Sequence, residues 1–194
     1  MDSNKEEVLL KETTTDIVAP VAKETNDSFT TTKPVFESES SKTALLKNKL
    51  GAFAYSAIQA EKGVRVIENE LLKLTIDNKG GQIVEALIKN YKTYDSLPLY
   101  MIKDNNASFN INFGTTDNRI LNTKDLFFIP TLSKNNGNDV LSMKLKVSDT
   151  QFLEYRYEMK PNEYMVDFSI RSQGLSSVIN GSNAINLNWS LKGF

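Results

Sequence analysis

Apolar and polar residues alternate along most of the chain after Val64, and this period of two limits the fold more than any other feature. In residues 72–77 (LKLTID) every second side chain is apolar, as in a strand with one buried face. Residues 77–81 (DNKGG) interrupt the pattern, and two consecutive glycines allow positive φ angles. We therefore expect a tight reversal here, followed by a second strand over residues 82–89.

The same alternation returns in later stretches of the chain, which are separated by turn residues. The apolar members of these runs are Phe109, Ile111 and Phe113; Leu141, Met143, Leu145 and Val147; Leu153, Tyr155, Tyr157 and Met159; Tyr164, Val166, Phe168 and Ile170; and Ile185, Leu187, Trp189 and Leu191. Hairpin turns are expected at residues 135–138 (NNGN), 160–163 (KPNE) and 180–181 (NG). Short strands at this spacing, each with a solvated polar face, predict an all-β fold of antiparallel strands, either a sandwich or a barrel.

The first 60 residues have a different composition. Residues 1–42 are rich in Thr, Ser, Glu and Lys and cannot bury enough apolar surface to offset the entropy cost of ordering. Apolar residues return over 43–59 at a spacing that fits a short helix interrupted at Gly51. We expect residues 1–60 to form a disordered tail. Its helical segment is either a linker that samples helix, or a docking segment for a partner or for the domain itself.

Charge and composition exclude several classes of function. The 23 basic and 24 acidic residues give a formal net charge of -1, and the basic residues are scattered, which disfavours nucleic acid and anionic lipid as partners. The chain has no cysteine, so disulfides, thiolate nucleophiles and zinc–thiolate sites are excluded. It also has no histidine, the usual general acid or base near neutral pH. We predict no catalytic residue, no cofactor and no metal site.

The N-terminus does not have the pattern of a secretion signal. Residues 1–7 (MDSNKEE) are polar, and no apolar core of signal-peptide length follows them. No window of the sequence is apolar for long enough to cross a membrane. Taken by itself, the chain is expected to be soluble.

Carboxylate pairs are the main candidates for acid–base chemistry. Glu68 with Glu70, and Glu154 with Glu158, are pairs of the type that glycoside hydrolysis requires. Because both pairs fall on the outward face of strand patterns, we expect solvated surface charge instead. Residues 77–80 (DNKG) begin like a calcium-binding loop but lack its further acidic ligands, so a hairpin turn is favoured.

Three tyrosines occur close together where turn residues are frequent. Tyr91, Tyr94 and Tyr100 could stack on a sugar, since binding residues often lie in loops. Trp189 and the alternating tyrosines of the later strands have the spacing of core residues instead. Core packing is therefore favoured for those aromatic side chains.

Several of these stretches, taken in order, resemble a known family. They are the strand that ends at Asp77, the Gly80–Gly81 pair with Ile83, the region of Tyr91, residues 98–100 (PLY), residues 160–164 (KPNEY) leading into Val166, Phe168 and Ile170, and residues 187–189 (LNW). In this order they are similar to the large periplasmic domain of the YidC membrane protein insertases, and they look most like the Bacteroidetes versions. The resemblance runs from about Val64 to Phe194.

The resemblance implies a fold and a cellular setting. It implies that residues 61–194 form a periplasmic β-sandwich of the supersandwich type, related to galactose mutarotase, and that this sandwich is incomplete at its C-terminal end. Such an unfinished sandwich should be less stable than the complete domain. Met1 would then be a start added to a piece of a protein of the inner membrane, with the region described here facing the periplasm.

The resemblance also implies a function. The family helps membrane proteins to insert and fold, and its partners are nascent membrane proteins and components of the Sec translocon, reached through the full-length protein. Insertion uses a hydrophilic groove among transmembrane helices, so contact with the membrane would come only through helices that lie outside this sequence. No site residue can be carried onto this chain, which is expected to be noncatalytic.

Two other functions remain open from the sequence. A secreted or periplasmic glycan-binding β-sandwich would explain the asparagine and tyrosine content of the loops. A sugar-processing enzyme of the mutarotase type is the least favoured, because such sites resemble one another in using a histidine, and this chain has none.

Overall fold

The computed structural model describes residues 39–193, and most of the chain from Val64 onward is strand. The strands are β1 (Val64–Glu68), β2 (Leu72–Asp77), β3 (Ile83–Lys92), β4 (Pro98–Ile102), β5 (Ala107–Gly114), β6 (Ile120–Asn122), β7 (Ile129–Asn135), β8 (Asn138–Lys146), β9 (Phe152–Met159), β10 (Val166–Gln173) and β11 (Asn186–Leu191). The runs with alternating polarity became β2, β5, β8, β9, β10 and β11. The strands β4, β6 and β7 gave no such signal.

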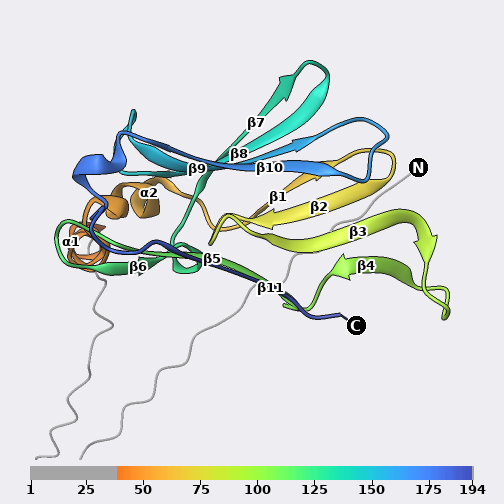
Figure 1. Ribbon diagram of the computed structural model, residues 1–194, viewed down its shortest axis with the longest axis horizontal. Coiled ribbons are helices and arrows are strands. Elements are labelled where there is room, and N and C mark those ends of the chain that lie inside the picture. Colours follow the sequence, from red (N-terminus) through yellow and green to blue (C-terminus); the bar gives the residue numbers. More distant parts are fainter. Residues whose placement is uncertain (1–38, 194) are drawn as a thin grey trace, which may run out of the picture. The chain divides into compact units, whose positions relative to one another are not determined.

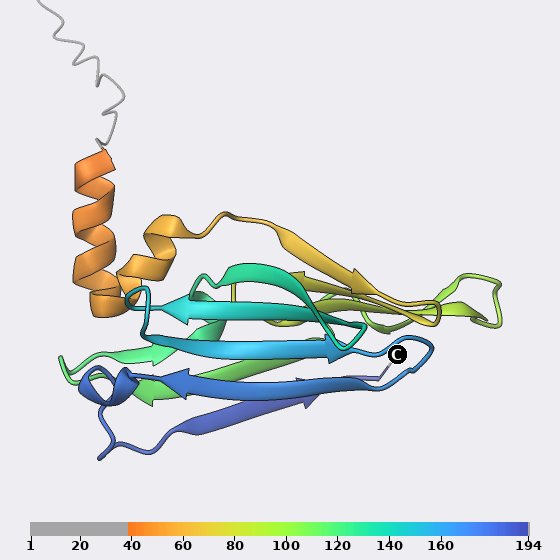
Figure 2. The same cartoon turned by 90° about the horizontal axis from the view of Figure 1, so that it is seen from above.

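The strands form three sheets. Sheet 1 has the order β1-β2-β3-β4, sheet 2 the order β10-β9-β8-β7, and sheet 3 the order β11-β5-β6. Every pair of neighbouring strands in the described residues is antiparallel. Sheet 2 forms one layer, and sheets 1 and 3 lie on the other side of the core (Figures 1 and 2). The predicted antiparallel β-sandwich is confirmed, whereas its relation to galactose mutarotase stays a prediction.

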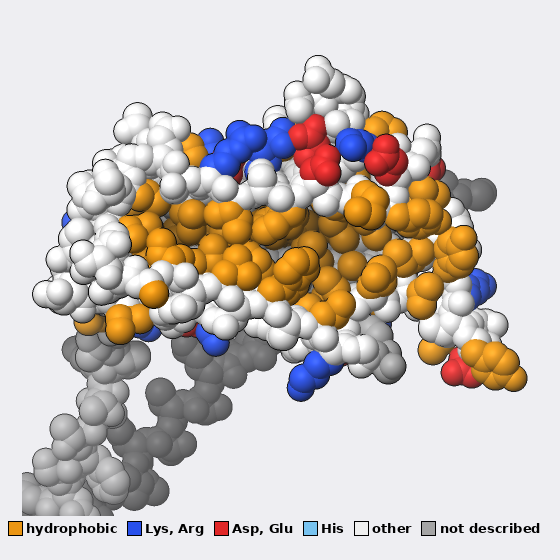
Figure 3. All heavy atoms as spheres, in the orientation of Figure 1, with side chains coloured by type: hydrophobic (Ala, Val, Ile, Leu, Met, Phe, Trp, Pro, Cys, Tyr) orange, Lys and Arg blue, Asp and Glu red, His pale blue; other side chains and the backbone are white. Residues whose placement is uncertain are grey.

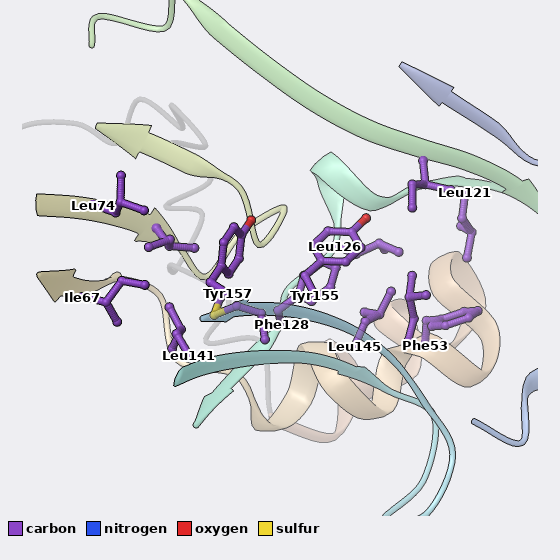
Figure 4. Close-up of a cluster of buried hydrophobic side chains, with 14 of the residues drawn as sticks. Phe53, Ile67, Leu74, Leu121, Leu126, Phe128, Leu141, Leu145, Tyr155 and Tyr157 are labelled. Carbon is purple, nitrogen blue, oxygen red and sulfur yellow. The ribbon is translucent and has the colours of Figure 1, made fainter. Parts of the chain in front are cut away.

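All three sheets contribute to one hydrophobic core. Tyr155 and Leu141 of sheet 2 are completely buried, as is Ile76 of sheet 1, and Phe113 of sheet 3 is 1% exposed. In Figure 4, Tyr155 and Tyr157 point from sheet 2 toward the other layer, with Leu74 on one side and Leu121 on the other. The core therefore connects the layers through side chains that come from distant parts of the sequence.

The turn between β2 and β3 is anchored in this core. Gly80 and Gly81 both have positive φ angles, of 83° and 62°, as their sequence predicts. The Gly80 N–H donates to the carbonyl of Leu126 (2.8 Å), and the Tyr157 hydroxyl donates to the carbonyl of Gly81 (2.7 Å). Burial raises the pKa of Tyr157, so its hydroxyl stays protonated and remains a donor. The turn thus fixes sheet 1 against sheet 2.

Asn78, in the same turn, holds two other segments of chain. It is completely buried, and its backbone N–H donates to the carbonyl of Gly63 (2.9 Å). Its Nδ2 donates to the carbonyl of Glu61 (2.9 Å), and its own carbonyl accepts from the N–H of Phe128 (2.8 Å). Of these bonds only the one from Nδ2 belongs to the side chain, so replacing Asn78 by an apolar residue would take this donor from the carbonyl of Glu61. The stretch that could have been a calcium loop is therefore a structural turn.

Helices precede the first strand. They are α1 (Glu39–Leu50), a 3-10 turn η1 (Gly51–Phe53) and α2 (Ala54–Gln59), so the helical segment expected over 43–59 is broken at Gly51, whose φ is 58°. None of the described helices has the length and apolar character needed to span a bilayer. The rest of the expected tail, residues 1–38, lies outside the described residues. The division of the chain at residue 60 stays a prediction.

The segment around α2 packs against the sandwich. Phe53 is 1% exposed, and its ring lies 5.3 Å from that of Phe113 in an edge-to-face arrangement. The Ser56 hydroxyl donates to the carbonyl of Phe127 (2.8 Å). Arg119 donates through Nη2 to the carbonyl of Asn48 (3.0 Å) near the end of α1. These contacts are those of a segment that docks on its own domain.

Two of the three expected hairpin turns are confirmed. Residues 135–138 join β7 to β8, with Asn136 and Gly137 both at positive φ, and residues 160–163 lie between β9 and β10. The expected hairpin at 180–181 is wrong. These residues lie in the connection from β10 to β11, which leaves sheet 2 and enters sheet 3, because β11 pairs with β5 and not with β10. An Asn-Gly pair indicates a turn, but it does not indicate which strands the turn connects.

The polar face of β8 and β9 differs from the sequence expectation. Glu154 and Glu158 are buried, at 8% and 9% exposure, so the interpretation of both as solvated surface charge is wrong. The Ser142 hydroxyl of the neighbouring strand donates to Glu154. The β7–β8 hairpin and Arg156 cover Glu158. The alternation correctly predicted that Glu154 and Glu158 lie on the polar face of the strand. It did not predict the neighbouring side chains that cover them.

The close packing of Gly81 predicts the effect of adding a side chain there. A Cβ at this position would lie 3.1 Å from Phe128 Cγ and 3.1 Å from Tyr155 Cδ2, on a backbone that only glycine adopts easily. We expect Gly81→Ala to lower the free energy of unfolding by about 2–4 kcal/mol. Gly137→Ala is the matched control, because Gly137 also has positive φ but nothing lies near its Cβ. Equal losses for the two variants in urea unfolding would contradict this reasoning.

The hydrogen bonds of Glu158 predict a dependence of stability on acid. Donors from Asn138, Arg156 and Asn135 lower the pKa of its carboxyl from 4.5 to about 2. The folded form then binds fewer protons than the unfolded form between these values, so stability is full above pH 4.5 and is lost as the pH falls toward 2. The free energy of unfolding of Glu158→Gln should change less over this pH interval than that of the parent protein. Glu70→Gln, on the exposed β1–β2 turn, should keep the parent's profile in urea titrations at each pH.

Candidate interaction surface

An uncovered apolar band lies between β10 and β11. We call it the apolar seam, and it consists of Ile83, Ile102, Phe109, Val166, Phe168, Ile170, Leu187, Trp189 and Leu191. Figure 3 shows the apolar side chains running as a continuous band between the two layers. A band of this length is unusual on a protein surface, where exposed apolar residues are normally scattered. The seam is therefore the leading candidate for an interaction site.

The register of the strands explains why these side chains are apolar. Phe168 pairs with Tyr157, and Trp189 pairs with Phe109, so β10 and β11 extend the core-facing sides of sheets 2 and 3. Their apolar faces are covered only in part, since Phe168 contacts Phe109 across the cleft while Leu187 and Trp189 stay more than half exposed. Trp189 is 73% exposed, and the prediction that it packs in the core is wrong, although it does face the core side.

Aromatic rings form the floor of the seam. Phe109 lies 5.5 Å from Phe168 and 6.2 Å from Trp189, both edge-to-face, and Tyr157 lies 4.8 Å from Phe168. A cleft opens here, and none of the described residues that line it is charged. Such a lining can bind apolar side chains or a strand with one apolar face. It provides no acid, base or nucleophile pair.

The structure does not bring the candidate carboxylates together at a reactive site. Glu68 accepts from Lys89 Nζ at 2.9 Å, and this bond lowers the pKa of its carboxyl. Glu70 lies on the exposed turn after it. Glu154 and Glu158 have separate partners in sheet 2, as described above. Residues 39–193 contain no group of three acidic side chains that could hold a metal ion.

The three loop tyrosines have three different environments. Tyr91 packs edge-on against Tyr164, with ring centroids 6.5 Å apart, whereas Tyr100 lies beneath the ammonium group of Lys103. Tyr94 is completely exposed at the tip of the β3–β4 hairpin. No ring contact in the described residues joins any two of the three. They do not form a shared platform for a sugar.

The apolar seam was missed in the sequence, although one signal could have revealed it. Residues 186–191 (NLNWSL) alternate like a core-facing strand and contain no charged residue. An edge strand without charge is unusual, since edges are normally protected by charges or prolines. The composition of β11 was therefore a sign that something should cover it.

Comparison with known proteins relates the chain to one family. A sequence model of the YidC periplasmic domain matches residues 65–190. The membrane protein insertase YidC of Parabacteroides distasonis is 34% identical over 145 residues, which are 74% of this chain and 22% of that protein. The insertase YidC of Porphyromonas gingivalis is 33% identical over 153 residues, 78% of this chain and 24% of that protein.

A third relative has the same proportions. The membrane protein insertase YidC of Bacteroides fragilis is 31% identical over 137 residues, 70% of this chain and 22% of that protein. The chain thus spans less than a quarter of the length of these relatives. No solved structure matches it. With a family match over residues 65–190 and relatives above 30% identity, the chain belongs to the YidC periplasmic domain family.

Proposed function

We propose that this chain is the first part of the periplasmic domain of a membrane protein insertase, and that it assists the insertion and folding of inner-membrane proteins. The observation that carries the proposal is the family match over residues 65–190, together with relatives that are named as membrane protein insertases. In the full-length protein this region faces the periplasm. Its partners are nascent membrane proteins and components of the Sec translocon.

The role of the region is to bind and position, without catalysis of its own. The absence of histidine and cysteine from the sequence supports this, as does the engagement of Glu68, Glu154 and Glu158 in structural bonds. The apolar seam offers a partner an apolar surface, which suits binding rather than chemistry.

The domain division follows the same proposal. Residues 1–60 form a tail that bears the helical segment, and residues 61–194 form a sandwich that is incomplete on the side of β10 and β11. The apolar seam supports this, since two core-facing strands expose side chains that a complete sandwich would bury. In the full-length protein, further strands of the domain would cover the seam.

Photo-crosslinking in the full-length protein tests the proposed partners. A photo-reactive amino acid is placed at Tyr94, which is completely exposed, and at Ile120, which is 73% exposed on another sheet. We expect adducts with Sec components or membrane proteins in synthesis from at least one position. The same probe at the buried Leu141 is the control and should give none. Adducts only with soluble periplasmic proteins from both exposed positions would contradict the proposal.

The thermal midpoint tests the proposed incomplete sandwich. A version of the protein that extends beyond Phe194 through the rest of the domain should unfold at a higher temperature than the 194-residue chain, because it buries the apolar seam. For domains of this size, each 1 kcal/mol of added stability raises the midpoint by about 2–4 °C. Calorimetry of both proteins at one concentration measures the difference. Equal midpoints would show that the seam needs no further strands.

A further inference from the structure

An Asn-Gly pair occurs twice in the sequence, and the structure gives the two pairs different surroundings. Asn136–Gly137 forms the tip of the β7–β8 hairpin, whereas Asn180–Gly181 lies in the connection from β10 to β11. The backbone nitrogen that follows an asparagine can attack the side-chain amide carbon, and glycine offers the least obstruction because it has no side chain. The local geometry then decides which of the two pairs reacts.

The backbone around Asn180 is a turn that is tied to sheet 3. Its N–H donates to the carbonyl of Gly114 (2.9 Å), and its carbonyl accepts from the N–H of Asn183 (3.2 Å). The Asn180 side chain folds back over this turn, since its Oδ1 accepts from the N–H of Ser182 (3.0 Å). That bond closes a small ring of atoms, which also contains the Gly181 nitrogen. The side-chain amide carbon and the nitrogen that would attack it are therefore held within one ring.

The Ser182 N–H also prepares the Asn180 amide for attack. When a nucleophile adds to a carbonyl carbon, negative charge develops on the oxygen, and a donor already aimed at that oxygen stabilises the charge. The Ser182 N–H is such a donor for Asn180 Oδ1. The Gly181 N–H makes no hydrogen bond with the described residues, and nothing lies within 4 Å of the place that a Cβ would take. The attacking nitrogen is therefore unobstructed.

The pair in the hairpin is held differently. Asn136 and Gly137 have φ angles of 48° and 88°, and residues 135 and 138 pair across the end of the ladder. The side chains of Asn135 and Asn138 both donate to Glu158, at 2.9 and 2.7 Å. Ring closure at Asn136 would need the Gly137 peptide to turn, and the pairing on both sides resists this. No hydrogen bond within the described part of the chain polarises the Asn136 side-chain amide.

We propose that Asn180 is a site of spontaneous deamidation, and that it reacts ahead of Asn136. The Gly181 nitrogen forms a bond to Asn180 Cγ, the Cγ–Nδ2 bond breaks, and ammonia leaves with the proton of the Gly181 amide. Water then opens the cyclic imide at either of its carbonyls, which leaves aspartate or isoaspartate. The proposal uses only contacts between described residues, so it depends neither on where the chain ends nor on the proposed function.

Either product changes the connection that leads to β11. The formal net charge falls by one from -1, because a neutral amide becomes a carboxylate. Isoaspartate also adds a CH₂ group to the backbone between the Thr115–Ile179 bridge and β11. The modification thus alters the segment before a strand that borders the apolar seam.

Mass spectrometry of the aged protein tests the proposal. The folded 194-residue chain is kept in mildly alkaline buffer, which favours loss of the amide proton, and its peptides are followed over time. We expect Asn180 to convert at least about tenfold faster than Asn136, since its reacting groups are held together and its oxygen has a donor. In urea the two rates should become similar, because the turns that distinguish them are lost. Equal rates in the folded protein, or the same ratio in urea as in buffer, would overturn the proposal.

The products identify the route of the reaction. Opening of a cyclic imide gives isoaspartate together with aspartate, and fragmentation of the peptide that contains residue 180 separates the two. We expect both products at this position. Aspartate alone would show that water attacks the amide directly, and would overturn the proposal.

Variants of the turn test the two contributions. Ser182→Pro removes the N–H that donates to Asn180 Oδ1, so conversion should slow about tenfold or more. Ser182→Ala keeps that N–H and is the matched control, which should convert at the parent's rate. Gly181→Ala places a methyl group beside the attacking nitrogen, where the structure has room for it, so it should slow conversion and keep the parent's stability in urea. Conversion of Ser182→Pro or of Gly181→Ala at the parent's rate would overturn the proposal.

Discussion

The contact between the β2–β3 turn and the aromatic side chains of sheet 2 is the constraint on which the rest of the structure depends. A Cβ at Gly81 would lie only 3.1 Å from Phe128 and from Tyr155, and the Gly81 carbonyl accepts a hydrogen bond from the Tyr157 hydroxyl. Asn78 in the same turn holds the backbone near Gly63. One turn of five residues therefore fixes the distance between the layers and the approach of the helical segment to the sandwich.

Because that contact sets the spacing of the layers, it also decides where the core is open. Tyr155 and Tyr157 fill the space between sheet 2 and the other sheets, and Phe109 and Phe168 continue the aromatic contacts outward. Beyond Phe109 the apolar faces of β10 and β11 are only partly covered, and Trp189 is 73% exposed. The apolar seam is thus the continuation of the core and not a separate groove that the surface happens to carry.

The sequence predicted most of the strands and little of what covers them. The alternation in β2, β5, β8, β9, β10 and β11 has its origin in the geometry of a strand, so it could be read locally. Gly80 and Gly81 were correctly expected at positive φ for the same reason. The burial of Glu154 and the exposure of Trp189 depend on neighbouring strands from other parts of the chain. No local pattern contains that information.

The connection from β10 to β11 shows that strand pairing, like burial, could not be predicted from the local sequence. Asn180–Gly181 has the residues of a hairpin turn, but the chain crosses from sheet 2 to sheet 3 there. Turn residues specify the local backbone, whereas strand pairing is set by which apolar faces can be buried together. For Trp189 the best partner in the described residues is Phe109, which lies about 80 positions earlier in the chain. The residues close to Trp189 in the sequence give no indication of such a distant partner.

The composition of an edge strand, by contrast, can be read locally and indicates where the strand lies in its sheet. A strand that will remain at the edge of a sheet must carry its own protection, so the absence of charges and prolines from an alternating run indicates a strand with neighbours on both sides. β7 and β10 carry such protection and β11 does not. The sequence of β11 is therefore that of an interior strand, which the described residues leave with one neighbour. A strand that comes to lie beside it must present an apolar face toward β10.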